Sequence, residues 1–168
     1  MDFLLPLENS GFFSWVREST SLFAFPGILL LHTIGMGLVV GINAGIDLRI
    51  LGIAPALPLA PMEKFFPILW IGFWINAATG TILLLADAST KLRNPVFSIK
   101  MVFIALALVN LRMLRTRVFR DPLIDKRPLS TNDKILAATS LFFWIGAITA
   151  GRLMAYVGPV SGLEAFLR

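Results

Sequence analysis

An uninterrupted apolar stretch near the start of the chain, FAFPGILLLHTIGMGLVVGINA at residues 23–44, is the strongest indication of the fold. It contains no charged residue, and its titratable side chain is His32, the single histidine of the protein. About 20 apolar residues are enough for a helix to cross the roughly 30 Å hydrocarbon core of a bilayer. We therefore interpret this stretch as a membrane-spanning helix that carries an imidazole.

Three further apolar stretches have a similar length, at residues 65–86, 97–114 and 135–157. The 168 residues are 57% hydrophobic and only 15% charged, with a mean hydropathy of +0.80, which is far outside the usual soluble range. The apolar runs are continuous and do not alternate, so helices are favoured over a membrane barrel. The predicted fold is all-α: one domain, residues 1–168, forming a polytopic four-transmembrane-helix bundle.

Capping signals mark several helix starts. A short interfacial helix is predicted around Trp15, and Pro26 lies in the first turn of the first span, where a proline costs little. Asn94 followed by a proline predicts an N-cap for the third span, and Ser130 with Asp133 predicts a capping box for the fourth.

Basic residues are concentrated in the loops that follow the first and third spans. The first loop carries Arg49 and Lys64. The second carries seven: Arg112, Arg115, Arg117, Arg120, Lys126, Arg127 and Lys134. By the positive-inside rule, both loops are cytoplasmic and both termini lie outside the cytoplasm. Because topology explains this charge, we expect anionic lipid headgroups as its counter-charge and no nucleic-acid partner.

Several residue types and motifs are absent from the sequence, and their absence excludes particular classes of sites and enzymes. The absence of cysteine excludes disulfides, thiolate-bound zinc, iron–sulfur clusters and cysteine nucleophiles. The sequence shows no serine, histidine and carboxylate arrangement, no phosphate-binding glycine loop and no paired carboxylates. Residues 1–6 lack the basic and apolar regions of a cleavable signal peptide. We therefore expect a non-catalytic membrane protein.

The two halves of the chain show a faint internal repeat. IDLRIL at residues 46–51 corresponds to VNLRML at 109–114, and FWINAAT at 73–79 corresponds to FWIGAIT at 143–149. The two αα-hairpins are either copies related by an axis along the membrane normal, or apolar segments that match by chance.

Polar residues gather in the outer half of the predicted bundle. The first span runs inward and the fourth outward, so His32 and Arg152 differ in depth by only about 6 Å, at a rise of about 1.5 Å per residue. Tyr156 shares a helical face with Arg152, Lys100 lies one turn into the third span, and Asp87 closes the second. We expect these five residues to form a ligand-binding or cofactor-binding pocket.

His32 and Arg152 each have alternative roles. For Arg152 there are three alternatives: it extends to the outer headgroups, it pairs with another residue inside the bundle, or it binds an anionic or quinone-like ligand. His32 makes an interhelical hydrogen bond, acts as an axial ligand to haem or another tetrapyrrole, or takes a proton or metal role. One histidine cannot supply two imidazoles to one iron, so a haem would be five-coordinate, would use a methionine such as Met154, or would be shared in a homodimer.

Other residues are expected to be structural. Gly37, Gly41 and Gly45 recur every four residues and predict close packing against another helix. Asn76, with Gly72 and Gly80 four residues to either side, predicts a hydrogen bond across a close helix contact. At the inner ends of the first and third spans, four polar residues predict a salt-bridged latch: Asp47, Arg49, Asn110 and Arg112.

The ordered set of these motifs resembles a family of bacterial integral membrane proteins with four helices, known only as a domain of unknown function. The shared positions include Arg17-Glu18-Ser19, Leu31-His32, Asp47-Leu48-Arg49, Thr79-Gly80, Asn94-Pro95 with Phe97 and Lys100, and Ala150-Gly151-Arg152 with Ala155-Tyr156. The resemblance implies a four-helix fold and a bacterial inner-membrane location. Some relatives carry a further histidine where this chain has basic residues around Arg115.

We consider three hypotheses for function. The first is a non-catalytic inner-membrane accessory subunit or scaffold, whose outer pocket binds a partner, a lipid, a quinone or a tetrapyrrole. The second is a small metal or solute carrier built from the two hairpins, and the third is a haem-binding membrane electron carrier. Expected partners are the lipid bilayer and either another membrane protein or a second copy of the chain.

Overall fold

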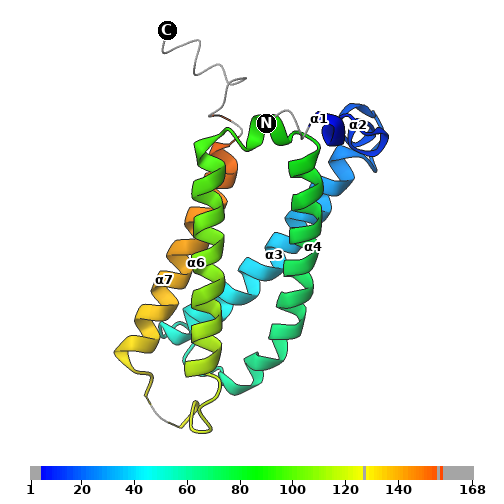
Figure 1. Ribbon diagram of the computed structural model, residues 1–168. Coiled ribbons are helices and arrows are strands. Elements are labelled where there is room, and N and C mark those ends of the chain that lie inside the picture. The colour runs from blue at the N-terminus through cyan, green and yellow to red at the C-terminus, as the bar shows by residue number, and fades with distance from the viewer. Residues whose placement is uncertain (1–4, 127, 155, 157–168) are drawn as a thin grey trace.

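Four long helices dominate the computed structural model, which describes residues 5–126, 128–154 and 156 (Figure 1). They are α3 (Phe25–Ile50), α4 (Phe66–Leu85), α6 (Pro95–Arg117) and α7 (Thr131–Leu153). Within the described residues, four helices are long and apolar enough to cross a membrane, and no strand occurs. The prediction of an all-α, multi-pass, four-helix bundle is confirmed.

Four short elements connect or flank the long helices. They are α1 (Leu5–Glu8), α2 (Gly11–Glu18), the 3-10 helix η2 (Ala60–Phe65) and α5 (Ala88–Lys91). The predicted helix starts are confirmed. The Asn94 side chain accepts a hydrogen bond from the Val96 backbone at 2.9 Å, and Ser130 and Asp133 form a reciprocal capping box.

The two ends of the bundle differ in structure (Figure 1). One end, which we call the α5 end, holds α5 together with the first turns of α3 and the last turns of α7. The opposite end, which we call the loop end, holds η2 and the connection from α6 to α7. The α5 end contains His32, whereas the loop end contains most of the arginines that follow the third span.

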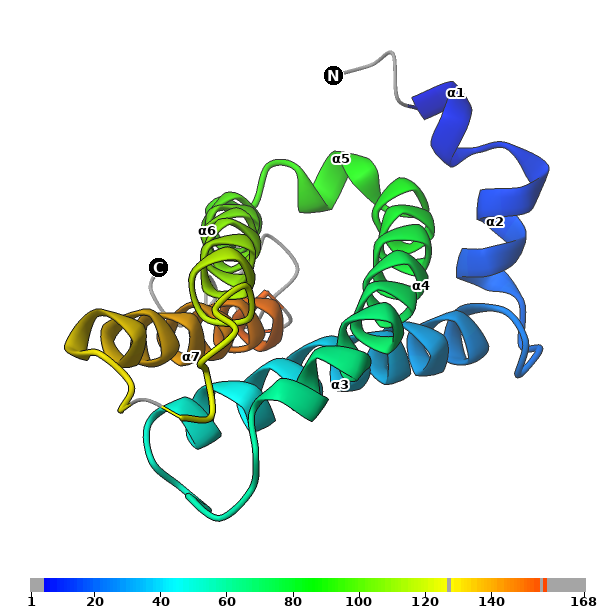
Figure 2. The ribbon, with the colours of Figure 1, turned by 90° about the horizontal axis from the view of Figure 1, so that it is seen from below.

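The long helices pair into two hairpins, α3 with α4 and α6 with α7, and the hairpins meet along α3 and α7. Seen along the bundle, α4 and α6 stand apart and α5 bridges them (Figure 2). The predicted hairpin organisation is therefore present, while the common origin of the hairpins stays a prediction. Corresponding tryptophans have different surroundings, because Trp74 is exposed and Trp144 is buried.

The close contact between α3 and α4 depends on two glycines that the repeat of Gly37, Gly41 and Gly45 did not include. A Cβ at Gly35 would lie 2.8 Å from the Gly72 carbonyl oxygen, and one at Gly72 would lie 2.6 Å from Leu38 Cβ. A Cβ at any of the three predicted glycines meets nothing within 4 Å. The prediction that the stripe of Gly37, Gly41 and Gly45 packs against another helix is therefore wrong. Spacing identifies a face of small residues, but it does not show which face of α3 contacts the neighbouring helix.

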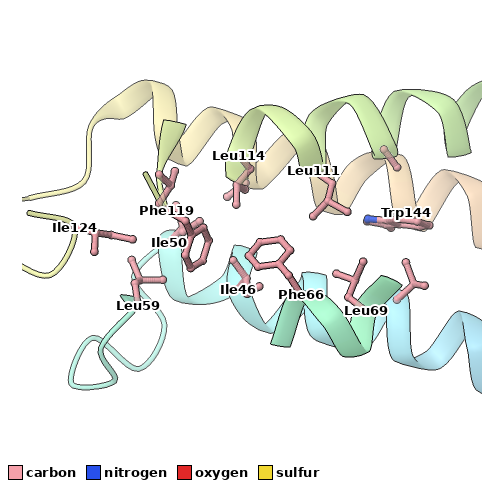
Figure 3. Close-up of a cluster of buried hydrophobic side chains, with 14 residues drawn as sticks. Ile46, Ile50, Leu59, Phe66, Leu69, Leu111, Leu114, Phe119, Ile124 and Trp144 are labelled. Atoms are coloured by element: carbon pink, nitrogen blue, oxygen red, sulfur yellow. The ribbon is translucent and has the colours of Figure 1, made fainter. Parts of the chain in front are cut away.

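The main apolar core lies toward the loop end (Figure 3). Its helical members include Ile46 and Ile50 of α3, Phe66 and Leu69 of α4, Leu111 and Leu114 of α6, and Trp144 of α7. Leu59, Phe119 and Ile124 close it from the loops. The Asp125 carboxylate ties these loops together, because it accepts hydrogen bonds from the Leu59 and Ala60 backbone N–H groups at 2.6 and 3.1 Å.

Candidate ligand site at His32

His32 is held between α3 and α4 by a reciprocal set of hydrogen bonds. Its Nδ1 lies 3.0 Å from the Asn76 backbone oxygen and 3.1 Å from Thr79 Oγ1. In return, Asn76 Nδ2 donates to the His32 backbone oxygen at 2.7 Å. These contacts fix both the backbone register of the two helices and the orientation of the imidazole.

The hydrogen bonds also assign the tautomer of the ring. A carbonyl oxygen can only accept, so the proton shared with Asn76 must sit on Nδ1 of His32. The Thr79 hydroxyl donates to the Ile75 carbonyl at 2.6 Å, which leaves its oxygen free to accept as well. In the neutral ring, Nε2 therefore carries the lone pair and is the nitrogen that can bind a metal or accept a proton.

Gly80 provides the space for the His32 ring. A Cβ at this position would lie 2.9 Å from His32 Cε1 and 3.3 Å from Nδ1. The first of these distances is shorter than real Cβ contacts, so any larger residue would displace the imidazole. The motif Thr79-Gly80 thus supplies an acceptor for Nδ1 and the clearance for the ring.

Lysines provide the charge near this site. Among the described residues, Lys100 and Lys91 lie close enough to act electrostatically on the His32 imidazole. The Lys100 stem crosses Gly151, where a Cβ would lie 3.7 Å from its Cε. Lys91 donates to the Leu83 backbone oxygen; burial lowers the pKa of Lys91, and the neighbouring Asp87 carboxylate opposes that effect. The surroundings of His32 therefore favour an anionic group.

Arg152 and Tyr156 do not join His32, contrary to the predicted pocket. Both side chains are exposed, Tyr156 to 63%, and neither forms a side-chain hydrogen bond or ion pair with the described residues. The reason is helical phase. Arg152 follows the buried Ala150 by two residues, or about 200° around α7, so it lies off the packed face. Equal depth along the bundle was not sufficient to bring the two side chains together.

A second polar cluster lies at the contact between the hairpins. Asn43 Nδ2 donates to Asp47 Oδ2 at 2.5 Å and to Ser140 Oγ of α7 at 2.6 Å. All three side chains are buried, and Asp47 is 0% exposed. Asp47 Oδ1 has no hydrogen-bond partner among the described residues. A buried carboxyl group with one unsatisfied oxygen is expensive in a bilayer and marks a functional candidate.

The predicted latch at the inner helix ends takes a different form. Asp47 contacts Asn43 rather than an arginine, and Arg49 donates to the backbone oxygens of Pro55 and Leu57 in the loop. Asn110 donates to Thr139 Oγ1 at 2.8 Å, while its Oδ1 has no partner in the described part of the chain. The loop folds back toward Arg49, so its carbonyl oxygens accept the hydrogen bonds of a guanidinium that was expected to pair with a carboxylate.

The sequence placed Gly80 at a close helix contact, but it did not predict that Gly80 makes room for the His32 ring, nor the roles of Thr79 and Ser140. Thr79 and Gly80 lie three and four residues after Asn76, and this helical spacing was the available signal for a shared face. Ser140 had no such signal, because its contact with Asn43 depends on how the hairpins cross. No cluster of three or more metal-ligating side chains occurs among the described residues.

Comparisons with family models, curated proteins and solved structures found no match. The resemblance to the four-helix bacterial family therefore stays a prediction. The geometry around His32 and Asp47 is the remaining basis for assigning a function.

Proposed function

We propose that this chain is a non-catalytic membrane subunit that binds a tetrapyrrole such as haem, with His32 Nε2 as the axial ligand. The observation that carries this proposal is the pair of acceptors on Nδ1, Asn76 O and Thr79 Oγ1. Metal-binding histidines commonly donate their second ring nitrogen to a carbonyl or another acceptor, which fixes the ring and raises the basicity of the ligating nitrogen.

The surrounding residues favour a tetrapyrrole over a free metal ion. A tetrapyrrole supplies four nitrogen ligands of its own and needs one strong donor from the protein. The described residues around His32 offer that one donor and no metal-ligating cluster. Lys91 and Lys100 can neutralise acidic substituents on the macrocycle, and the apolar helices supply the low-polarity surroundings that such a ring prefers.

One histidine leaves the sixth coordination position for another donor. We propose either a five-coordinate centre or a donor from a second copy or a partner membrane protein. We also propose a bacterial inner-membrane location with the loop end in the cytoplasm. The concentration of arginine and lysine at the loop end supports this orientation by the positive-inside rule.

A haem titration of the purified protein tests the ligand role. We expect a Soret band to develop as haem binds, and His32→Gly to remove it, with added imidazole restoring it by filling the vacated position. Gly80→Ala is expected to weaken binding, because its Cβ displaces the ring. Gly37→Ala is the matched control, since a Cβ there meets open space. Unchanged binding by His32→Gly without imidazole contradicts the proposal.

A proton-coupled or cation-coupled carrier is a second candidate, favoured by Asp47. Ion sites in small carriers commonly lie where two repeats meet, and Asp47 occupies that position between the α3–α4 and α6–α7 hairpins. A proton or a small cation would satisfy its unpartnered oxygen. Proteoliposomes with an imposed pH gradient are expected to show proton flux that Asp47→Asn abolishes. Equal flux in both, or flux no greater than in empty vesicles, removes this candidate.

A further inference from the structure

A pocket lies at the loop end, between the last turns of α6 and the η2–α4 junction, well separated along the bundle from His32. Its volume is about 470 Å³. Its lining includes Glu63, Phe66, Trp70, Arg112, Arg115 and Arg120. The role assigned to His32 does not involve any of these residues.

The polar side of this pocket is strongly basic. Arg112, Arg115 and Arg120 contribute three guanidinium groups, against the single carboxylate of Glu63. Arg112 and Arg115 are three residues apart on α6 and therefore share a face. The Arg115 guanidinium lies 5.1 Å from the centre of the Phe66 ring, which holds it at the pocket wall. Planar guanidinium groups bind phosphate oxygens in bidentate geometry.

The other side of the pocket is apolar and continues onto the outer surface of the bundle. Trp70 and Val109 line the pocket and are also exposed, to 36% and 57%. Leu108 lies beside Val109 on α6 and adds to the same wall. An exposed apolar wall on a membrane-spanning helix faces lipid. The pocket is therefore open toward the bilayer and suits a ligand with an apolar chain attached to an anionic head.

The depth of the arginines agrees with such a ligand. Arg112 lies five residues before the end of α6 at Arg117, or about 7.5 Å at the helical rise. Arginine side chains near the end of a membrane helix reach the headgroup layer. The guanidinium groups thus lie at a depth suited to lipid phosphates, while Val109 lies further from the end of α6.

The frame around the pocket is well packed. Phe66 packs edge-to-face on Phe119 at a ring distance of 5.1 Å, and Asp125 binds the backbone at the start of η2. These contacts join the α6–α7 connection to the η2–α4 junction (Figure 3). The two walls of the pocket are consequently held in place before a ligand binds, which lowers the entropic cost of binding.

We propose that this pocket is a specific site for one anionic phospholipid, whose phosphate binds Arg112, Arg115 and Arg120 and whose acyl chain lies along Trp70, Leu108 and Val109. The site differs from general attraction of a basic loop to a charged membrane, because it requires the particular arginines that line the pocket. Other basic residues at the same end contribute net charge without lining the pocket.

Native mass spectrometry of the delipidated full chain tests this proposal. The protein is mixed with phosphatidylglycerol or phosphatidylcholine, and lipid adducts are counted against concentration. We expect phosphatidylglycerol to bind preferentially and Arg112→Gln/Arg115→Gln to weaken it about tenfold, a loss of about 1.4 kcal/mol. Arg117→Gln/Lys126→Gln removes the same charge outside the pocket and is expected to keep wild-type affinity. An equal loss in both double variants overturns the proposal.

Two additional measurements distinguish a phospholipid site from a site for free phosphate. Val109→Trp fills the pocket without changing charge and is expected to reduce adducts while the protein keeps its helical circular dichroism. Inorganic phosphate is expected not to displace the lipid, because it lacks the chain that contacts the apolar wall. Efficient displacement by phosphate, or wild-type adducts in Val109→Trp, contradicts a phospholipid site.

Discussion

Asn76 and His32 bind each other twice across the α3–α4 contact. The imidazole Nδ1 donates to the Asn76 backbone oxygen at 3.0 Å, and the Asn76 amide donates to the His32 backbone oxygen at 2.7 Å. One bond orients the ring and the other fixes the backbone beside it. The same pair of residues therefore serves both helix association and the orientation of the imidazole.

Replacing Asn76 by alanine is expected to separate these two effects. The substitution removes the amide bond to the His32 backbone but keeps the backbone carbonyl at position 76 that accepts from Nδ1. Interhelical hydrogen bonds in membranes contribute about 0.6 to 2 kcal/mol, so we expect a loss of that order in the free energy of unfolding. Unfolding in mixed micelles measures it. Haem affinity is expected to fall much less than in His32→Gly, and equal losses of affinity would argue against the assigned roles.

The close approach of α3 to α4 predicts opposite effects at two glycines of the same helix. Gly35→Ala places a Cβ 2.8 Å from backbone atoms of α4 and is expected to lower the melting temperature. Gly41→Ala meets open space and is expected to be neutral or slightly stabilising, since alanine favours helix over glycine by about 1 kcal/mol. Thermal unfolding of both variants in one detergent compares them directly. A larger effect at Gly41 would place a helix contact on the predicted glycine stripe instead.

The buried cluster predicts that Asn43, although uncharged, contributes strongly to the free energy of unfolding. Asn43→Leu removes the donor to both Asp47 and Ser140 and leaves the carboxyl group without that hydrogen bond. Loss of a partner from a buried polar group costs about 1 to 3 kcal/mol, and more for a charged one. Adding Asp47→Leu to Asn43→Leu is expected to recover part of this loss, which chemical unfolding of the wild type, the two single variants and the double variant measures. Additive destabilisation would mean that the two side chains are not coupled.

The contact of α1 with α5 is expected to depend on pH. The Glu8 carboxylate accepts from Ser89 N at 2.9 Å and from Ser89 Oγ at 3.0 Å, and the backbone hydrogen bond lowers the pKa of Glu8 below its ordinary value. A lowered folded-state pKa stabilises the docked form at neutral pH, and this stabilisation is lost as the pH falls through the carboxyl range. Hydrogen exchange of residues 5–18 is expected to accelerate on acidification in the wild type. In Glu8→Gln, the exchange rate should already be raised at neutral pH and should change little on acidification. If this variant responds to pH as the wild type does, the pH dependence belongs to another group.

The sequence was sufficient for the fold because its signals were local. Continuous apolar runs indicated the four spans, and Asn94 and Ser130 marked helix starts through hydrogen bonds to residues two or three positions away. The candidate site depended on helix rotation, which local pattern does not determine. His32 faced α4 and hydrogen-bonds to Asn76, whereas Arg152 lay off the packed face of its helix. Ser140 and the pocket around Arg112 required the crossing of separate hairpins to be known.

The sharpest test of His32 as a tetrapyrrole ligand is the visible absorption spectrum of the protein purified from the membranes of its native host. We predict a Soret band in the wild-type protein and its loss in His32→Ala purified at comparable yield and with the same helical content. A spectrum without absorption above the aromatic region in the wild type, or an identical Soret band in both proteins, would contradict this role of His32.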